Sequence, residues 1–447
     1  MRIDAFPGIS RYLPALFILA GAPLMNAHAQ TPLAQSILED KDLLAVMDRA
    51  KAIVATGFNA GDGYGEVWIR DLNTFMDLAC AVHPKETVRE KLEIFFHFQG
   101  DDGNIADGYI PKAQASVGYD FIHSASAPDY AAHKNTVETD QESSLVLGVC
   151  RYVRATGDTG FLHSVVNGRT VAQRLEDALR FVRTVRFAEA YGLVWGGATA
   201  DWGDVQPEHE WGVVLDENSH RAIDIYDNAL YLTAIDAFLG TAPDLPAATR
   251  QEWTAFRAQV AANVRKHLWD TERKKFIPHV YLNGSPFPAD FDENAIYYHG
   301  GTAVAIEADL LSTEEVKEAL VRMAKNVRDA GAASIGLTMY PAYPAGFFKN
   351  PGMAKPYSYQ NGGDWAWFGG RMIQQLVRHG LAEEAYRELR PMLRQVLDND
   401  GFYEWFTIEN APRGSGAYRG AAGVLYQAIV MLRGWAEQEI KTASGNG

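Results

Sequence analysis

Cysteine is scarce in this sequence. The 447 residues include only two cysteines, Cys80 and Cys150, each in an apolar pattern of helical type. They could form a disulfide or remain as two buried free thiols. The cysteines and histidines of this chain are not spaced as they are in metal-binding motifs. No spacing implies a metal or an organic cofactor, so we expect the protein to need none.

Positive charge is also in short supply. The chain has 41 Lys and Arg against 56 Asp and Glu, which gives a formal net charge of −15. A nucleic-acid partner requires a basic face, and anionic lipid attracts the same kind of surface. The balance therefore argues against nucleic acid and against docking on a membrane, and it leaves the oligomeric state open.

Long apolar runs are missing beyond the N-terminus. Residues 12–25 form an apolar run after two arginines, and this run is too short for an ordinary transmembrane helix. Ala27 and Ala29 follow it with the small-residue spacing of a signal-peptide cleavage site. We predict a signal peptide over residues 1–29 and a mature protein that is exported, periplasmic or secreted, and free of the membrane.

The rest of the chain repeats one order of elements. A polar loop with Gly or Asp opens an apolar helix, a Gly closes it, and an amphipathic helix follows, with a period of roughly 60–80 residues. The pattern contains no domain linker, low-complexity run or strand–helix–strand alternation, so residues 30–447 are predicted to form a single domain. We expect an all-α fold, an (α/α)6 barrel of inner and outer helices, with minor β hairpins at residues 191–195 and 275–281. The expected helices cover residues 33–54, 67–82, 85–98, 143–155, 159–187, 247–267, 313–330, 382–397 and 420–440, with further apolar helices starting near residues 222, 300 and 361.

Two segments carry more specific expectations. Residues 109–135 have few helix signals and are predicted to be an irregular excursion over one face. Thr139 and Glu142 are spaced as in a capping box, which predicts that they begin the helix at residue 143. Capping would also explain Asp140, and it would explain Asn228 at a later helix start.

Acids, amides and tryptophans occur together in the loops that precede the apolar helices. In a closed barrel these loops meet at one end, where they would form a concave carbohydrate site. An aromatic face packs on a sugar ring, and a carboxyl in a semi-apolar pocket keeps the raised pKa that acid catalysis needs. The loop motifs are Trp68-Ile69-Arg70-Asp71, Glu138-Thr139-Asp140, Asp201-Trp202-Gly203-Asp204, Tyr226-Asp227-Asn228, Asn361-Gly362-Gly363-Asp364-Trp365 and Tyr403-Glu404-Trp405.

The order of these motifs resembles that of the six-hairpin (α/α)6-barrel glycosidases. This group includes trehalase, the family 63 α-glucosidases and mannosylglycerate-type hydrolases, the family 100 invertases and the glucoamylase-like enzymes. The resemblance runs from about residue 55 to 435. It departs from the group's pattern at Ala366, where proline is usual, and at Ala417-Tyr418-Arg419, where an aromatic-Ser-Trp segment is common.

The resemblance implies an exo-acting, inverting glycoside hydrolase on a carbohydrate substrate, cleaving an α-linked oligosaccharide or glycoside. Asp201 would be the general acid and Glu404 the general base, with Asp204 and Glu409 as the rival assignments. The predicted sugar-binding residues are Trp68, Arg70, Asp71, Asp140, Trp202, Asp204, Asn228, Asn361, Gly363, Asp364, Trp365 and Trp367.

Other interpretations of the same residues stay open. Asp201 could cap the next helix beside a buried tryptophan, and Arg70 and Asp71 could form an ion pair at an exposed helix end. A sugar isomerase, epimerase or lyase also fits an α-barrel, and His279 or His299 beside Asp201 in the pocket would favour it. A non-catalytic glycan-binding protein would keep the tryptophans without two facing carboxylates.

Overall fold

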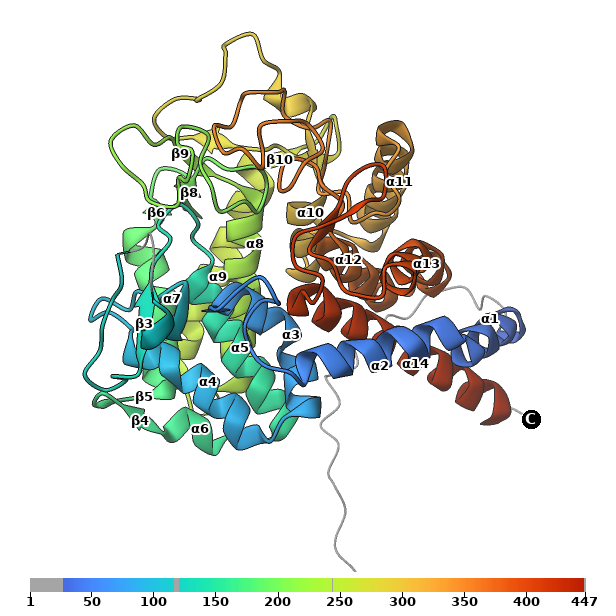
Figure 1. Ribbon diagram of the computed structural model, residues 1–447, viewed down its shortest axis with the longest axis horizontal. Coiled ribbons are helices and arrows are strands. Elements are labelled where there is room, and N and C mark those ends of the chain that lie inside the picture. Colours follow the sequence, from blue (N-terminus) through green and yellow to red (C-terminus); the bar gives the residue numbers. More distant parts are fainter. Residues whose placement is uncertain (1–26, 116–119, 243, 446–447) are drawn as a thin grey trace, which may run out of the picture.

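The computed structural model describes residues 27–115, 120–242 and 244–445, and six of its helices form a closed inner ring. Each inner helix contacts the next along the chain, and the last contacts the first. This ring confirms the all-α barrel expected from the repeated pattern (Figure 1). The inner helices are α3 (Ile69–Val82), α5 (Gln141–Thr156), α8 (Ile225–Thr241), α10 (His299–Glu307), α12 (Ala366–Arg378) and α14 (Arg419–Gly445).

An outer helix precedes each inner helix in the chain and packs against the ring. The outer helices are amphipathic and bury one stripe, whereas α8 is buried at almost every position along its first ten residues. Capping boxes at Thr170 and Ser312 fix the starts of two outer helices. The outer helices are α2 (Lys41–Val54), α4 (Lys85–His97), α7 (Val171–Val185), α9 (Ala247–His267), α11 (Thr313–Ala330) and α13 (Ala382–Asp398).

The N-terminal helices lie beside the C-terminal one. α1 (Ala27–Glu39) and α2 both contact α14, and Figure 1 shows them running alongside it. The single helix expected over residues 33–54 is two helices, because the Asp40 side chain accepts a hydrogen bond from the Asp42 N–H and starts a new one. The predicted signal peptide falls largely on residues 1–26, which lie outside the described residues.

Two other expectations about local structure are wrong. No capping box forms at residues 139–142, because the Thr139 hydroxyl donates to the Trp195 carbonyl and Glu142 accepts from Lys134 and the Ile105 N–H. The helix expected over 159–187 is interrupted after α6 (Gly160–His163) by a short hairpin of β4 (Val165–Val166) and β5 (Arg169–Thr170).

Short antiparallel sheets stiffen the loops. The excursion at residues 109–135, expected to be irregular, contains two strands of a three-stranded sheet, β1 (Val67–Trp68), β2 (Gly108–Pro111) and β3 (Tyr130–His133). The hairpin expected near residues 191–195 forms, because residues 193–194 pair with residues 187–188. The hairpin expected at 275–281 does not form: residues 275–276 pair with residues 269–270, and residues 280–281 pair with residues 222–223. The remaining short elements are β6 (Phe187–Ala188), β7 (Leu193–Val194), β8 (Gly196–Gly197), β9 (Arg221–Ile223), β10 (Trp269–Asp270), β11 (Lys275–Phe276), β12 (Val280–Tyr281), β13 (Tyr297–Tyr298), β14 (Met339–Tyr340), β15 (Trp405–Phe406), β16 (Pro412–Arg413), η1 (Lys112–Gln114) and η2 (Glu293–Ala295).

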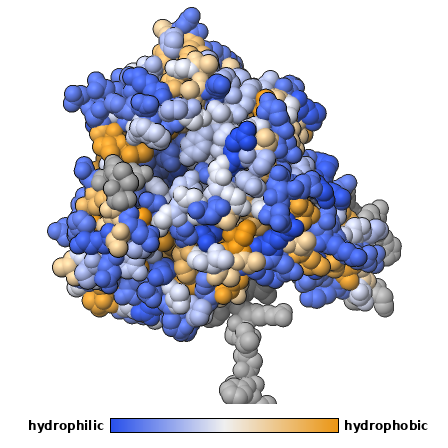
Figure 2. Space-filling view, in the orientation of Figure 1, coloured by the Kyte–Doolittle hydropathy of each residue, from blue (hydrophilic) through white to orange (hydrophobic). Residues whose placement is uncertain are grey.

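Three further features concern the surface, the cysteines and the length of the apolar helices. The face seen in Figure 2 is mostly hydrophilic, with small separate hydrophobic patches. Cys80 and Cys150 are both free thiols. Within residues 27–115, 120–242 and 244–445, no helix is long and apolar enough to cross a membrane.

Candidate functional site

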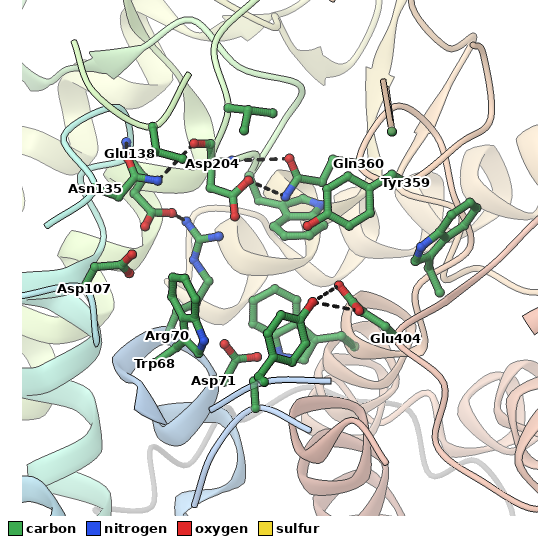
Figure 3. A pocket seen from close by; sticks show the side chains of 18 of the residues that line it. Trp68, Arg70, Asp71, Asp107, Asn135, Glu138, Asp204, Tyr359, Gln360 and Glu404 are labelled. Atoms are coloured by element: carbon green, nitrogen blue, oxygen red, sulfur yellow. Dashed lines mark hydrogen bonds and ion pairs between the residues drawn. The ribbon is translucent and has the colours of Figure 1, made fainter. Parts of the chain in front are cut away.

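A cavity of about 520 Å³ opens where the loops before the inner helices meet. Its lining comes from the loops that precede α3, α5, α8, α12 and α14, together with the first residues of α3 and α12 (Figure 3). The volume lies within the ~300–1,000 Å³ typical of small-molecule sites. The predicted site residues that line the cavity are Trp68, Arg70, Asp71, Trp202, Asp204, Trp365, Trp367 and Glu404.

Asp201, the predicted general acid, does not line the cavity. The residue is 2% exposed, and its carboxylate accepts hydrogen bonds from the Gly301 N–H at 2.9 and 3.1 Å. It therefore binds the start of α10, where the helix dipole favours negative charge. Burial raises the pKa of Asp201 well above its usual range, against the opposing effect of the Gly301 hydrogen bond. Asp201 thus binds the start of a helix, but that helix is α10 and not α8, the next one along the chain. Its carboxylate does not reach the cavity, which corrects its assignment as proton donor.

Asp140 and Asn228 also lie behind the cavity wall. Asp140 is fully buried and accepts hydrogen bonds from Arg70 Nε at 2.6 Å and from the Tyr226 hydroxyl at 3.1 Å. The Asn228 amide pairs with the backbone N–H and carbonyl of Val194. Asp140 thus holds a cavity residue in place, and Asn228 joins a loop to α8, so neither contacts the space that a sugar would occupy.

Three residues of the Asn-Gly-Gly-Asp motif, its two polar residues and one glycine, have structural roles as well. The Asn361 amide accepts from the Tyr343 N–H at 2.8 Å and donates to the Tyr343 carbonyl. Asp364 accepts from the N–H and hydroxyl of Ser334. Gly363 packs so tightly that a Cβ there would lie 2.4 Å from the Tyr359 carbonyl oxygen. The motif fixes the loop that delivers Trp365.

Glu404 is a buried carboxylate at the cavity wall, 5% exposed. The Tyr64 hydroxyl donates to its two oxygens at 3.0 and 2.9 Å, and the Ser415 N–H donates at 3.3 Å. Burial raises the pKa of Glu404 to about 7, although the Tyr64 hydrogen bond opposes the rise. A carboxyl that titrates near neutrality is suited to proton transfer.

Asp204 reaches the cavity from the loop before α8. It is partly exposed, unlike Asp201, and Gln360 Nε2 donates to its Oδ1 at 2.7 Å. Asn135 donates to the Asp204 carbonyl at 3.0 Å and so fixes its backbone. Figure 3 shows the carboxyls of Asp204 and Glu404 on different sides of the cavity, carried by loops that are far apart in the sequence.

Arg70 is paired with carboxylates of the protein itself. It is 7% exposed and forms ion pairs with Glu138 and Asp140. The alternative of an exposed Arg70–Asp71 pair at a helix end is therefore wrong. The guanidinium also lies 5.7 Å from the centre of the Trp202 ring. Among the described residues that line the cavity, Arg70 is the one Lys or Arg.

Two further aspartates in the cavity have raised pKa values. Burial raises the pKa of Asp71 to about 6, opposed by a hydrogen bond from Tyr418. Burial raises the pKa of Asp107 to about 8, with Arg70 acting in the other direction. His133 Nδ1 lies 3.8 Å from the Asp107 carboxyl, but burial lowers the pKa of His133 to about 4. At neutral pH this contact therefore joins a neutral imidazole to a largely protonated carboxyl.

Tryptophans close the cavity on the side of the inner helices. The ring of Trp202 lies 4.7 Å from that of Trp365 and 5.2 Å from that of Trp367, in edge-to-face contacts. All three are almost fully buried yet line the cavity. A buried aromatic wall provides apolar contact for the C–H faces of a sugar ring.

Sequence reasoning missed several residues of the lining. Tyr64 lies in a glycine-rich loop that carried no assignment, and Asp107, His133 and Asn135 lie in or beside the supposedly irregular excursion. One feature of the sequence could have identified them: they are polar or aromatic residues in loops that precede inner helices. Further lining residues outside the predicted set include Glu138, Trp211, Tyr359, Gln360, Trp405 and Tyr418.

The histidines and carboxyls at the cavity indicate which reactions it could support. Neither His279 nor His299 lines the cavity, and Asp201 does not either, so the histidine pattern that would favour an isomerase or lyase is not formed there. In the part of the chain that the structure describes, no group of three or more His, Cys, Asp or Glu could hold a metal ion. Two carboxyls at a cavity lined by aromatic rings can donate a proton to, and accept one from, a bound sugar and a water molecule.

Solved structures of similar fold include glycosidases. The chain is 16% identical to the GH63 mannosylglycerate hydrolase from Thermus thermophilus in complex with Tris and D-glycerate, covering 86% of this chain and 99% of that one with a TM-score of 0.58. It is 14% identical to the rhamnosidase from Klebsiella oxytoca with rhamnose bound, with a TM-score of 0.56. That match covers 87% of this chain and 63% of the rhamnosidase. At these identities the likeness establishes the fold alone.

The sequence itself matches a family. No curated protein sequence is significantly similar to this chain. Residues 120–428, more than half of the chain, match the family described as amylo-alpha-1,6-glucosidase. The matched region includes Asp204 and Glu404 as well as most of the cavity lining. The protein therefore belongs to the amylo-alpha-1,6-glucosidase family and is a glycoside hydrolase.

Proposed function

We propose that this protein is an exo-acting, inverting glycoside hydrolase that removes an uncharged, α-linked terminal sugar, with Asp204 as general acid and Glu404 as general base. The observation that carries the proposal is that these two carboxyls face one cavity from different loops. We assign the general acid to Asp204 and not to Asp201, because an acid catalyst must reach the glycosidic oxygen and the Asp201 carboxyl is turned to the start of α10.

The reaction transfers two protons. Glu404 takes a proton from a water molecule whose oxygen attacks the anomeric carbon, while the bond from that carbon to the glycosidic oxygen breaks. Asp204 gives its proton to the departing oxygen, and exchange with solvent then restores both groups. Inversion requires room for the water, so the carboxyls of inverting enzymes stand ~6.5–9.5 Å apart, compared with ~5–5.5 Å in retaining enzymes.

The closed end of the cavity supports exo action. Trp202, Trp365 and Trp367 are buried at the inner-helix side, so a sugar chain can enter from the mouth and end at the indoles. The hydrogen-bonding groups nearby, Asp71 and Asp107, are suited to the hydroxyls of a terminal ring.

The charges of the cavity support an uncharged substrate. Its acids include Asp71, Glu138 and Asp204, and its arginine is already paired with Glu138 and Asp140. Moving an anionic group into this site would leave it without a cationic partner, which is costly in a partly buried place. The similar Thermus enzyme binds D-glycerate, an anion. We propose that this chain does not accept such a group.

The first experiment is a substrate screen. Purified protein is incubated with isomaltose, maltose, kojibiose, nigerose, trehalose, α-1,2-mannobiose, α-rhamnosides and mannosylglycerate, with β-linked disaccharides as controls. We expect cleavage within the α-linked neutral set and release of a β-configured product, read by NMR before mutarotation. An α-configured first product would contradict inversion, and cleavage of mannosylglycerate alone would contradict the uncharged substrate.

The second experiment separates the roles of the acids. Replacement by the amide keeps the shape and removes proton transfer, worth ~10²–10⁴-fold in rate. Asp204→Asn should lose that much on a disaccharide but much less on the glycosyl fluoride of the same sugar, because fluoride leaves without protonation. Glu404→Gln should lose activity on both substrates. Asp201→Asn is the matched control, and an inactive Asp201→Asn beside an active Asp204→Asn would overturn the assignment.

Export is a separate proposal. We propose that residues 1–29 direct the chain out of the cytoplasm and are removed after Ala29. The support is the short apolar run followed by Ala27 and Ala29 at signal-peptidase spacing. N-terminal sequencing of protein from the exported fraction should start at Gln30, and a retained Met1 there would contradict the proposal.

A further inference from the structure

Trp211 is an exposed aromatic residue at the mouth of the catalytic cavity. It is 77% exposed, more than any other large hydrophobic residue of the described chain, and it also lines the cavity. An exposed indole forgoes the hydrophobic stabilisation that burial would give. A single exposed tryptophan needs no explanation on a plain surface, but this one lies beside the space where the substrate must enter.

The loop that carries Trp211 also carries Asp204. The proposed general acid must contact the glycosidic oxygen, and that oxygen leaves with the departing part of the substrate. Residues that continue from Asp204 toward solvent therefore face the departing part and not the terminal sugar. Trp211 lies seven positions further along this loop, and Val205 and Val213 add apolar lining beside it.

Hydrogen bonds hold the loop in a fixed shape. Gln206 bonds across it, from its N–H to the Gly212 carbonyl at 3.1 Å and from Nε2 to the Val214 carbonyl at 2.7 Å. Asn350 Nδ2 donates to the Glu210 carbonyl at 3.0 Å, next to Trp211. On the other side the Thr136 N–H donates to the Val213 carbonyl at 2.9 Å. The backbone beside the indole is thus anchored on both flanks, which lowers the entropy cost of binding against it.

We infer that Trp211 forms an aromatic platform on which the first sugar ring of the leaving group stacks. The inference rests on the proposed hydrolase function and adds that the substrate carries a sugar ring on the leaving side of the cleaved bond. The C–H face of a pyranose covers the indole, so binding buries apolar area that is exposed in the free protein.

The test compares two substrates that share a terminal sugar. One is the α-linked disaccharide that the wild-type protein cleaves best, and the other is the glycosyl fluoride of the same sugar, whose leaving group has no ring. The readout is the ratio of kcat/KM for the disaccharide to kcat/KM for the fluoride. For Trp211→Ala we expect this ratio to fall about tenfold, the effect of losing one stacked ring. Trp211→Phe should fall less, because a smaller aromatic face remains.

Val214→Ala is the matched control. Val214 is on the same loop, is 57% exposed and does not line the cavity, so its replacement should keep the wild-type ratio. An unchanged ratio in Trp211→Ala would overturn the platform, and so would an equal loss on both substrates, which would indicate a distorted loop. If the wild-type protein cleaves neither kind of substrate, the proposed hydrolase function itself fails.

Discussion

Glu404 and Glu307 lie at opposite ends of the barrel and have opposite electrostatic environments. Glu404 lies at the loop end, where its partners are the Tyr64 hydroxyl and the Ser415 N–H, both uncharged. Burial raises its pKa to about 7. This glutamate can exchange a proton near neutral pH.

Glu307 ends the inner helix α10 at the other end, beside a second cavity of about 360 Å³. Arg151 contacts it at 3.2 Å and Arg371 at 2.9 Å. Burial acts to raise the pKa of Glu307, but the two guanidinium groups hold it below the usual range. This glutamate stays ionised and joins α5, α10 and α12.

The comparison indicates what separates a catalytic acid from a structural one in this fold. Glu404 is buried and Glu307 largely so, and burial alone pushes both pKa values upward. Paired cations cancel that effect at one end, and neutral donors leave it in place at the other. A buried carboxylate without a cationic partner lowers the free energy of unfolding. At the loop end this destabilising arrangement is present at the residue that we expect to transfer a proton.

The largest expected effect is on catalysis at the loop end. Glu404→Gln should reduce kcat/KM by about 10²–10⁴-fold, because the amide cannot take a proton from water. Glu307→Gln, measured at a temperature where it is folded, should keep wild-type activity per folded molecule. Steady-state kinetics on the best disaccharide measure both. Equal losses in the two variants would remove the distinction between the two ends.

The next effect is on stability at the opposite end. Removing the negative charge of Glu307 leaves the buried Arg371 and the partly buried Arg151 without their partner, which should cost roughly 3–5 kcal/mol of unfolding free energy. Urea titration of Glu307→Gln measures it. Asp309→Asn is the control, because Asp309 is exposed and its pair with Arg378 is worth about 0–1 kcal/mol. A Glu307→Gln variant as stable as Asp309→Asn would contradict the structural role.

Glu404→Gln should stabilise the protein, in contrast to Glu307→Gln, and it should do so only at high pH. The folded pKa of about 7 lies above the usual 4.5, so the stability from this group is fully present below pH 4.5 and is lost as pH rises through 7. The amide has no charge to bury. Relative to wild type, the variant should gain roughly 1–3 kcal/mol at pH 8 and little at pH 4.5. Denaturation at both pH values tests this, and a pH-independent difference would contradict the raised pKa.

The smallest expected effect is on the pKa of Glu404 when its uncharged partner Tyr64 is changed. The Tyr64 hydroxyl stabilises the ionised form of Glu404, so Tyr64→Phe should raise the pKa of Glu404 further. Activity needs the ionised base and falls as pH drops through this pKa. The acidic limb of the kcat/KM profile should move up by about one pH unit. Tyr191→Phe, whose ring packs on His267 away from the cavity, is the control. A limb that stays in place would show that Tyr64 does not tune Glu404.

The sequence by itself determined the barrel and the end at which the site lies. Apolar inner helices and amphipathic outer helices are local patterns of period 3.6, and they predict burial without knowledge of the fold. The loops before the inner helices must then meet at one end, which brought Trp68, Asp71 and Glu404 to one cavity from sequence order alone.

Only the tertiary structure decided which acid of a motif faces that cavity. Asp201 and Asp204 are three residues apart on one loop, and no local pattern distinguishes them. The start of α10, about a hundred residues later in the chain, supplies the Gly301 N–H that turns Asp201 inward, while Gln360 holds Asp204 at the cavity. Likewise the Asn228, Asn361 and Asp364 side chains are used by distant backbone groups that a sequence does not identify. Hydrogen-bond partners far apart in the chain are set by packing, and packing decides which polar side chains remain for a substrate.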